Sequence, residues 1–79
     1  MQPVQLKSTS LRAVAYHDQL ALLELEFRSG AIYHYFDVST SIYKALLRAE
    51  SKGRYFNQYI RNSFTCAKIR AAIPQIAVS

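Results

Sequence analysis

The sequence has few of the residues that stiffen small folds. Its 79 residues include one cysteine, Cys66, two prolines, two glycines and no tryptophan. A single cysteine excludes an internal disulfide and is typical of a reducing compartment. Two glycines cannot form a glycine-rich phosphate-binding loop. We therefore expect a domain stabilised by its apolar core alone, for which 51% hydrophobic residues are sufficient.

Long apolar runs are also missing. No segment approaches the ~18 consecutive apolar residues of a membrane-spanning helix. The N-terminal residues 1–14 lack the apolar segment of ~7–15 residues that marks a signal peptide. Because 79 residues are too few for two domains, we expect one compact domain. The lack of long apolar runs predicts that this domain is cytoplasmic and has no membrane partner.

Acidic residues are absent from residues 51–79. The chain has ten Lys and Arg against five Asp and Glu, a formal net charge of +5. In residues 1–50 the two signs cancel, so the whole excess lies at Lys52, Arg54, Arg61, Lys68 and Arg70. This asymmetry favours a polyanionic partner such as RNA. The alternative is a solvated basic surface without such a partner.

Alternating apolar and polar residues predict three strands in the first half of the chain. They cover residues 11–17 (LRAVAYH), 20–27 (LALLELEF) and 31–36 (AIYHYF). Gly30 can take a positive φ in the connection between the last two strands. Residues 1–9 are expected to be a loose lead-in. The result is an antiparallel meander.

A helical period replaces the alternation after residue 38. Hydroxyl side chains at Ser39, Thr40 and Ser41 are candidate N-caps. Apolar residues then recur at helical spacing, at Ile42, Ala45, Leu46 and Ala49. Gly53 is placed to end this first helix in a left-handed conformation.

A second helix is predicted at about residues 54–63. One arc of this helix is apolar and holds Phe56, Tyr59, Ile60 and Phe64, whereas the opposing arc holds Arg54, Gln58 and Arg61. Residues 65–69 (TCAKI) form either a short strand or a covering segment. The tail, 71–79, has no periodicity and contains Pro74.

These elements predict an α+β domain, a three-stranded antiparallel β-meander followed by two α-helices packed on one sheet face. Both helices direct their cations away from that face. Lys44 and Arg48 do so on the first helix, and Arg54 and Arg61 on the second. We therefore expect a basic helical surface.

An ordered set of residues runs through most of these elements. It comprises Ser10, Val14, Tyr16, Leu23, Leu25, Phe27, Gly30, Tyr33, Tyr35, Tyr43, Leu46, Ala49, the segment Ser51-Lys52-Gly53-x-Tyr55-Phe56-Asn57, Ile60 and Arg61. In this set the chain resembles the KTSC domain family, which is named after the C-terminal domain of some lysyl-tRNA synthetases. The resemblance covers about residues 8–66, the core of one domain over 1–79. The family usually has Val-Pro at Val38-Ser39, so here a hydroxyl cap replaces proline.

The resemblance implies RNA binding through the synthetase connection and indicates no catalytic chemistry. We therefore predict a non-enzymatic domain that binds RNA, tRNA or bulk RNA, mainly through phosphates. The candidate residues are Lys44, Arg48, Lys52, Arg54, Asn57, Arg61 and Lys68. The alternative is a protein-interaction or homodimerisation module that docks through Tyr43 and Leu47 on the first helix, Leu22 on the open sheet face and the apolar tail.

Within this candidate surface, residues 51–61 (SKGRYFNQYIR) are the strongest segment. Lys52 and Arg54 flank Gly53 at the start of a helix, where free amides and the helix dipole both favour an anion. Asn57 adds a neutral hydrogen-bonding group. The alternative is a helix–helix turn anchored by its two aromatic residues, with no ligand.

Tyr33 and Tyr35 have two interpretations. On an open sheet face they would stack RNA bases. Glu24 and Glu26, however, are expected on that open face and would repel phosphates. We therefore infer that both tyrosines lie on the helix-covered side with a structural role. The same role is expected for the other family motif residues, Gly53, Tyr55 and Phe56.

Catalytic and metal-ligating patterns are weak. His17 and His34 lack the spacing of metal ligands, and Cys66 has no evident orienting partner. Glu24 and Glu26 share one side of a strand and are interpreted as surface charges. We predict no enzymatic activity, cofactor, metal site or small-molecule substrate.

Overall fold

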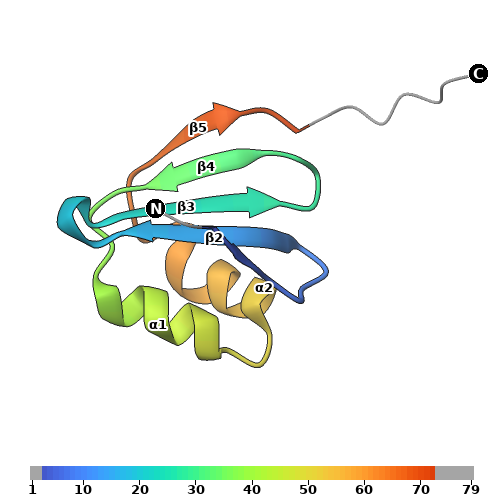
Figure 1. Ribbon diagram of the computed structural model, residues 1–79, viewed down its shortest axis with the longest axis horizontal. Coiled ribbons are helices and arrows are strands. Elements are labelled where there is room, and N and C mark those ends of the chain that lie inside the picture. Colours follow the sequence, from blue (N-terminus) through green and yellow to red (C-terminus); the bar gives the residue numbers. More distant parts are fainter. Residues whose placement is uncertain (1–2, 73–79) are drawn as a thin grey trace, which may run out of the picture.

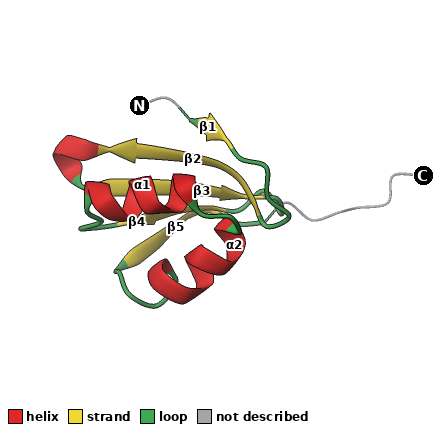
Figure 2. Cartoon of the chain, turned by 90° about the horizontal axis from the view of Figure 1, so that it is seen from below, coloured by secondary structure: helices red, strands yellow, loops and turns green. Residues whose placement is uncertain are grey.

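The computed structural model describes residues 3–72, in which one sheet is covered on one face by two helices (Figure 1). The sheet has five antiparallel strands in chain order, β1 (Val4–Gln5), β2 (Leu11–His17), β3 (Leu22–Phe27), β4 (Ile32–Tyr35) and β5 (Cys66–Arg70). Between β4 and β5 lie α1 (Thr40–Arg48), α2 (Lys52–Tyr55) and a π-helical turn (Phe56–Ile60). Figure 2 shows α1 and α2 against the same face.

The predicted three-stranded meander is therefore wrong, although the α+β class and the packing of both helices on one face hold. The lead-in contributes β1, in which Val4 pairs with Val14 and the backbone N–H of Leu6 then donates to the Arg12 carbonyl at 2.8 Å. Residues 65–69, which we left open between a strand and a cover, lie largely in β5 beside β4. Most of the tail, 73–79, lies outside the described residues.

The predicted alternation is confirmed by the strand register. Leu25 lies opposite Val14 on β2 and opposite Tyr33 on β4, so these three side chains share one face. Leu23, Leu25 and Val14 are almost completely buried there, with Leu46 of α1 above them. Burying one such side chain stabilises a fold by about 1.5–3 kcal/mol. The core thus lies between the sheet and the helices.

Helix α1 begins as predicted and ends earlier. The Ser39 hydroxyl accepts from the Ile42 amide at 3.4 Å, and Arg48 is the last helical residue. Ala49 is extended, so the helix ends without a left-handed residue. The Lys52 ammonium donates to the Ala49 carbonyl at 2.9 Å. This bond places a positive charge at the negative end of the helix dipole, where it is stabilising.

Gly53 lies inside α2 rather than at a helix end, so its predicted conformation is wrong. A Cβ at this position would lie 3.0 Å from the Ser10 hydroxyl oxygen. Gly53 therefore lies where α2 approaches the loop before β2 closely, and a larger side chain there would have to displace the Ser10 hydroxyl. Gly30, in contrast, has the predicted positive φ, 94°, in the β3–β4 turn.

The second helix differs from the predicted continuous α-helix. After four α-helical residues the chain forms a π turn, in which the Arg61 amide donates to the Phe56 carbonyl at 2.9 Å. A π turn accommodates an extra residue and shifts the side chains that follow. Phe56 and Ile60 are buried as expected, but Tyr59 is 47% exposed. Within residues 3–72, no helix combines the length and apolarity needed to cross a membrane.

Candidate nucleic-acid-binding groove

Tyr33 and Tyr35 lie on the helix-covered side of β4, which confirms their predicted placement. Tyr33 pairs with Leu25 and Tyr35 with Leu23 in the β3–β4 register. The two rings stack with centroids 6.3 Å apart, and the ring of Phe56 meets Tyr35 edge-on at 5.7 Å. Such aromatic contacts add about 0.5–1.5 kcal/mol beyond the burial of area.

These tyrosines also line a groove, which the sequence did not predict. The groove has a volume of about 740 Å³ and lies where β4 and β5 face the π turn. Its central lining residues, which define the "tyrosine groove", are Tyr33, Tyr35, Asn57, Arg61, Cys66 and Lys68. It exists in part because Cys66 and Lys68 lie opposite the two tyrosines on β5, and a small thiol and a flexible chain leave space there.

Cations and neutral hydrogen-bonding groups surround the aromatic rings of the groove. The Lys68 ammonium lies 6.0 Å from the centroid of the Tyr33 ring, within cation–π distance. Arg61 and Asn62 lie on the helical side and are exposed. The groove therefore combines a stacking surface with positive charge.

The hydroxyl of Tyr35 is protonated at neutral pH and can therefore donate a hydrogen bond. The pKa of Tyr35 is raised to about 12, chiefly by burial and then by Cys66 and Tyr33, and the charge of Arg61 acts in the opposite direction. Tyr35 is only 3% exposed yet lines the groove. A protonated phenol and a nearby guanidinium thus lie in one site.

A second hollow adjoins the tyrosine groove. It has a volume of about 600 Å³, and we call it the "serine hollow" after the serines that line it. Its charged and polar lining residues include Lys7, Ser8, Ser10, Glu50, Ser51, Lys52, Arg54 and Asn57, so it holds three cations and one carboxylate. The two depressions share Thr9, Ser10, Gly53 and Asn57, so they form one continuous concave surface. Lys7 comes from the lead-in and was not predicted, because its placement depends on the pairing of β1 with β2.

At the start of α2, where an anion site was predicted, Ser51 already accepts from backbone amides. The Ser51 hydroxyl accepts from the Arg54 amide at 3.3 Å, and the Ser51 carbonyl accepts from the Tyr55 amide at 3.0 Å. The helix itself has only four residues, so its dipole is small. Any phosphate at this surface would therefore be bound by side chains.

The predicted candidate residues fall into separate places. Asn57, Arg61 and Lys68 line the tyrosine groove, and Lys52, Arg54 and Asn57 line the serine hollow. The ammonium of Lys52 is already bound to the Ala49 carbonyl. Lys44 and Arg48 are exposed on α1, as predicted, and line neither depression.

Of the remaining motif residues, Tyr55 does not line the tyrosine groove. Its ring packs against that of Tyr59, with the centroids 4.7 Å apart, and both side chains border a third hollow, which shares Glu50, Ser51 and Arg54 with the serine hollow. Phe56 lies at the floor of the tyrosine groove, between Tyr35 and Phe27.

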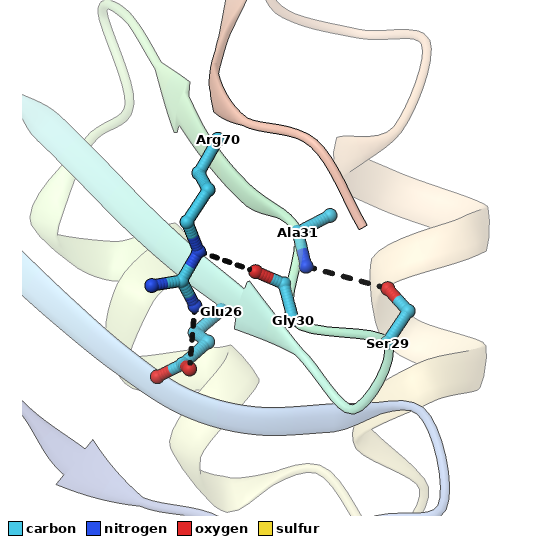
Figure 3. Close-up of polar contacts among 5 residues, drawn as sticks. All are labelled: Glu26, Ser29, Gly30, Ala31 and Arg70. Atoms are coloured by element: carbon cyan, nitrogen blue, oxygen red, sulfur yellow. Dashed lines mark hydrogen bonds and ion pairs between the residues drawn. The ribbon is translucent and has the colours of Figure 1, made fainter. Parts of the chain in front are cut away.

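The opposite face of the sheet carries Glu24 and Glu26, as predicted. Glu24 contacts His34 at 2.8 Å, and Glu26 contacts the Arg70 guanidinium at 3.2 Å. Arg70 also donates through Nε to the Gly30 carbonyl at 2.8 Å, so its side chain spans β5, the β3–β4 turn and β3 (Figure 3). These two hydrogen bonds hold β5, which forms one wall of the tyrosine groove, against β3 and the β3–β4 turn.

The described residues contain no group of three or more His, Cys, Asp or Glu side chains arranged to bind a metal ion. The carboxylates of the open face contact His34 and Arg70 instead.

A model of the KTSC domain matches residues 7–64. The chain belongs to the KTSC domain family. The crystal structure of a KTSC domain protein from Yersinia pestis is similar, with a TM-score of 0.85 and 30% sequence identity over 87% of this chain and 97% of that one. The match at residues 7–64 includes Lys7, Arg54 and Arg61 but ends before β5.

Two kinds of relative contain this domain. An uncharacterised protein from Stutzerimonas stutzeri is 46% identical over 61 residues, which cover 77% of this chain and 86% of that protein. A lysine–tRNA ligase from Nostoc sp. is 41% identical over 54 residues, 68% of this chain but 10% of the ligase. The domain thus occurs both as most of a small protein and as a small part of a tRNA ligase.

Proposed function

We propose that this chain is a non-enzymatic, cytoplasmic RNA-binding domain and that the tyrosine groove and the serine hollow form its RNA-binding surface. The observation that carries the proposal is the concave surface itself, where stacked tyrosines lie beside Arg61 and Lys68. Surfaces that bind unpaired nucleic acid usually combine aromatic rings with neighbouring cations.

The distribution of ion pairs supports this surface over the rest of the molecule. Within residues 3–72, the Glu24–His34 hydrogen bond and the Glu26–Arg70 ion pair both lie on the open face of the sheet. Arg54, Arg61 and Lys68 take no part in these pairs. Their charge is therefore available to phosphates, which provide most of the affinity in non-specific RNA binding.

The relatives support RNA as the partner. The similar segment in the Nostoc ligase belongs to a protein that is named for its action on tRNA. The docking alternative has less surface than we expected, because Tyr43 and Leu47 pack against the core and Tyr43 stacks on Tyr16 with centroids 4.8 Å apart.

A salt titration with bulk tRNA tests the proposal. With about four to six phosphate contacts, the logarithm of the association constant should fall with log[salt] at a slope of roughly −3 to −4. Fluorescence anisotropy between about 50 and 200 mM salt measures this slope. Binding that does not respond to salt, or no binding at 50 mM salt, would contradict the proposal.

Two charge-reversal variants then locate the surface. Arg54→Glu with Arg61→Glu changes the depressions, whereas Lys44→Glu with Arg48→Glu makes the same change of charge on α1. All four side chains are exposed, so both variants should fold, which circular dichroism verifies. We expect the first variant to abolish tRNA binding and the second to weaken it only moderately. Equal losses would place the surface elsewhere.

A further inference from the structure

The shape of the tyrosine groove narrows the class of RNA. We infer that the groove binds an unstacked base of single-stranded RNA, with the adjoining phosphate in the serine hollow. This inference rests on the proposed RNA-binding function. In a duplex the bases pair inside the helix and cannot enter a groove, whereas unpaired bases can be splayed onto aromatic side chains.

The dimensions of the groove fit a base rather than a bare phosphate. Its volume of about 740 Å³ lies within the range of about 300–1,000 Å³ that small-molecule sites occupy. A purely electrostatic phosphate surface needs no such concavity, because point contacts from exposed Lys and Arg suffice. The tyrosine groove therefore suits a planar ligand such as a base.

Tyr33 supplies the stacking surface. It is partly buried, and the Phe27 ring holds it edge-on at a centroid distance of 5.8 Å. The ring orientation is thus fixed by packing. From β5 the flexible Lys68 side chain lies over the ring, with its ammonium 6.0 Å from the centroid. That side chain can move aside for a base and keep its charge near the phosphate.

Hydrogen-bonding groups are available for the edge of the base. Asn57 and Asn62 each present an amide donor and an amide acceptor. Tyr35 presents a hydroxyl that stays protonated at neutral pH. Arg54 and Lys7 in the serine hollow lie on the continuous surface that starts at Asn57, where a connected phosphate would follow.

Three probes of equal length test the inference: a single-stranded octaribonucleotide, the same strand with abasic central positions, and the fully paired duplex. Stacking of one base predicts that the abasic strand binds about 5- to 150-fold more weakly than the intact strand at the same salt concentration. The duplex should also bind more weakly than the single strand, despite its higher charge density.

Variants connect this preference to the groove. Tyr33→Leu keeps an apolar side chain but removes the ring, so it should reduce the ratio between intact and abasic strands towards one. If this variant unfolds, Asn57→Ala with Asn62→Ala, both at exposed positions, should lower the same ratio. Lys44→Ala on α1 is the control, and it should leave the ratio unchanged.

The outcomes separate the two proposals. Equal binding of intact, abasic and duplex probes would overturn this inference and leave a charge-driven RNA-binding domain. No binding of any probe would overturn both. A wild-type preference that survives in the Tyr33 or Asn57/Asn62 variants would also overturn the inference, because the base would then lie elsewhere.

Discussion

The two faces of the sheet differ in the sign and the pairing of their charged side chains. On the open face, both glutamates of β3 contact a cationic or ionisable partner, Glu24 with His34 and Glu26 with Arg70. On the helix side, Arg61 and Lys68 border the tyrosine groove and take no part in those pairs. Strand β3 therefore directs its two glutamates away from the surface where a polyanion would bind, and Glu50 is the carboxylate that lines the serine hollow.

This comparison changes the meaning of the charge in the last third of the chain. The five cations there lie within 19 residues of the sequence, but their side chains lie on different surfaces of the fold. Arg70 points to the open face and contacts Glu26, and Lys52 binds the carbonyl of Ala49. Arg54, Arg61 and Lys68 remain for the concave surface. Position in the fold, rather than net charge, decides which of them are available to a polyanion.

The strongest test of the comparison uses two variants with equal and opposite changes of net charge. Arg61→Gln with Lys68→Gln removes two phosphate contacts, each worth about fivefold at 0.1 M salt for a single strand, so affinity should fall about 25-fold. Glu24→Gln with Glu26→Gln makes the protein more basic by two charges on the open face. We expect it to raise affinity no more than about threefold, because charges beyond one Debye length are largely screened. Anisotropy with the octaribonucleotide measures both.

Similar changes of opposite sign in the two variants would break the comparison. They would show that RNA responds to the net charge of the molecule and not to the groove.

Tyr35 gives a second test, through the pH dependence of stability. Its pKa in the folded protein is raised to about 12, above the value of about 10 of an exposed tyrosine. The folded state therefore keeps this proton while the unfolded state loses it. The stabilisation is complete below about pH 10 and is lost as the pH rises through 12. Urea unfolding at several pH values between 8 and 12 should show this decline.

Tyr35→Phe removes the ionisable group and should flatten the decline. Absorbance near 295 nm should also show one tyrosine titrating later than the others in the wild type but not in the variant. An unchanged pH profile in Tyr35→Phe would mean that another group causes the decline.

The smallest effect is expected at the contact that fastens β5. Arg70→Ala removes hydrogen bonds to Gly30 and Glu26, and we expect it to lower the free energy of unfolding by about 1–2 kcal/mol. Glu26→Gln, which leaves the bond to Gly30, should cost about 0–1 kcal/mol. Hydrogen exchange of the β5 amides should accelerate more in the first variant.

Glu24→Gln is the matched control for Glu26→Gln. It lies on the same face of β3, but its partner is His34 on β4. Exchange in β5 should therefore be unaffected. Acceleration of β5 exchange in this control would show that the open-face charges act together and that Arg70 has no special role.

The sequence predicted the local features of this fold well. Alternation located the three central strands and the side on which Tyr33 and Tyr35 lie, because one face is buried and the other is not. The cap at Ser39 and the exposure of Lys44 and Arg48 followed from helical spacing. Each of these features depends on neighbours within a few residues.

What could not be predicted depends on tertiary contacts. Strand β1 has two residues, too few for any pattern, and β5 is ordered by pairing with β4 and by Arg70. Gly53 lies where α2 approaches Ser10 closely, which no local signal shows. The π turn shifts the side chains after Phe56, so the helical wheel misplaced Tyr59. The groove combines these unpredicted elements, which is why only its individual residues were found.

The central claim is that RNA binds where the π turn faces β5. The most direct measurement is a map of ¹H–¹⁵N chemical-shift changes when bulk tRNA is added to the labelled protein. The account predicts the largest changes at residues 53–62 and 66–70, and small ones at Glu24 and His34. Changes that are confined to the open face or to α1, or no changes at all, would contradict it.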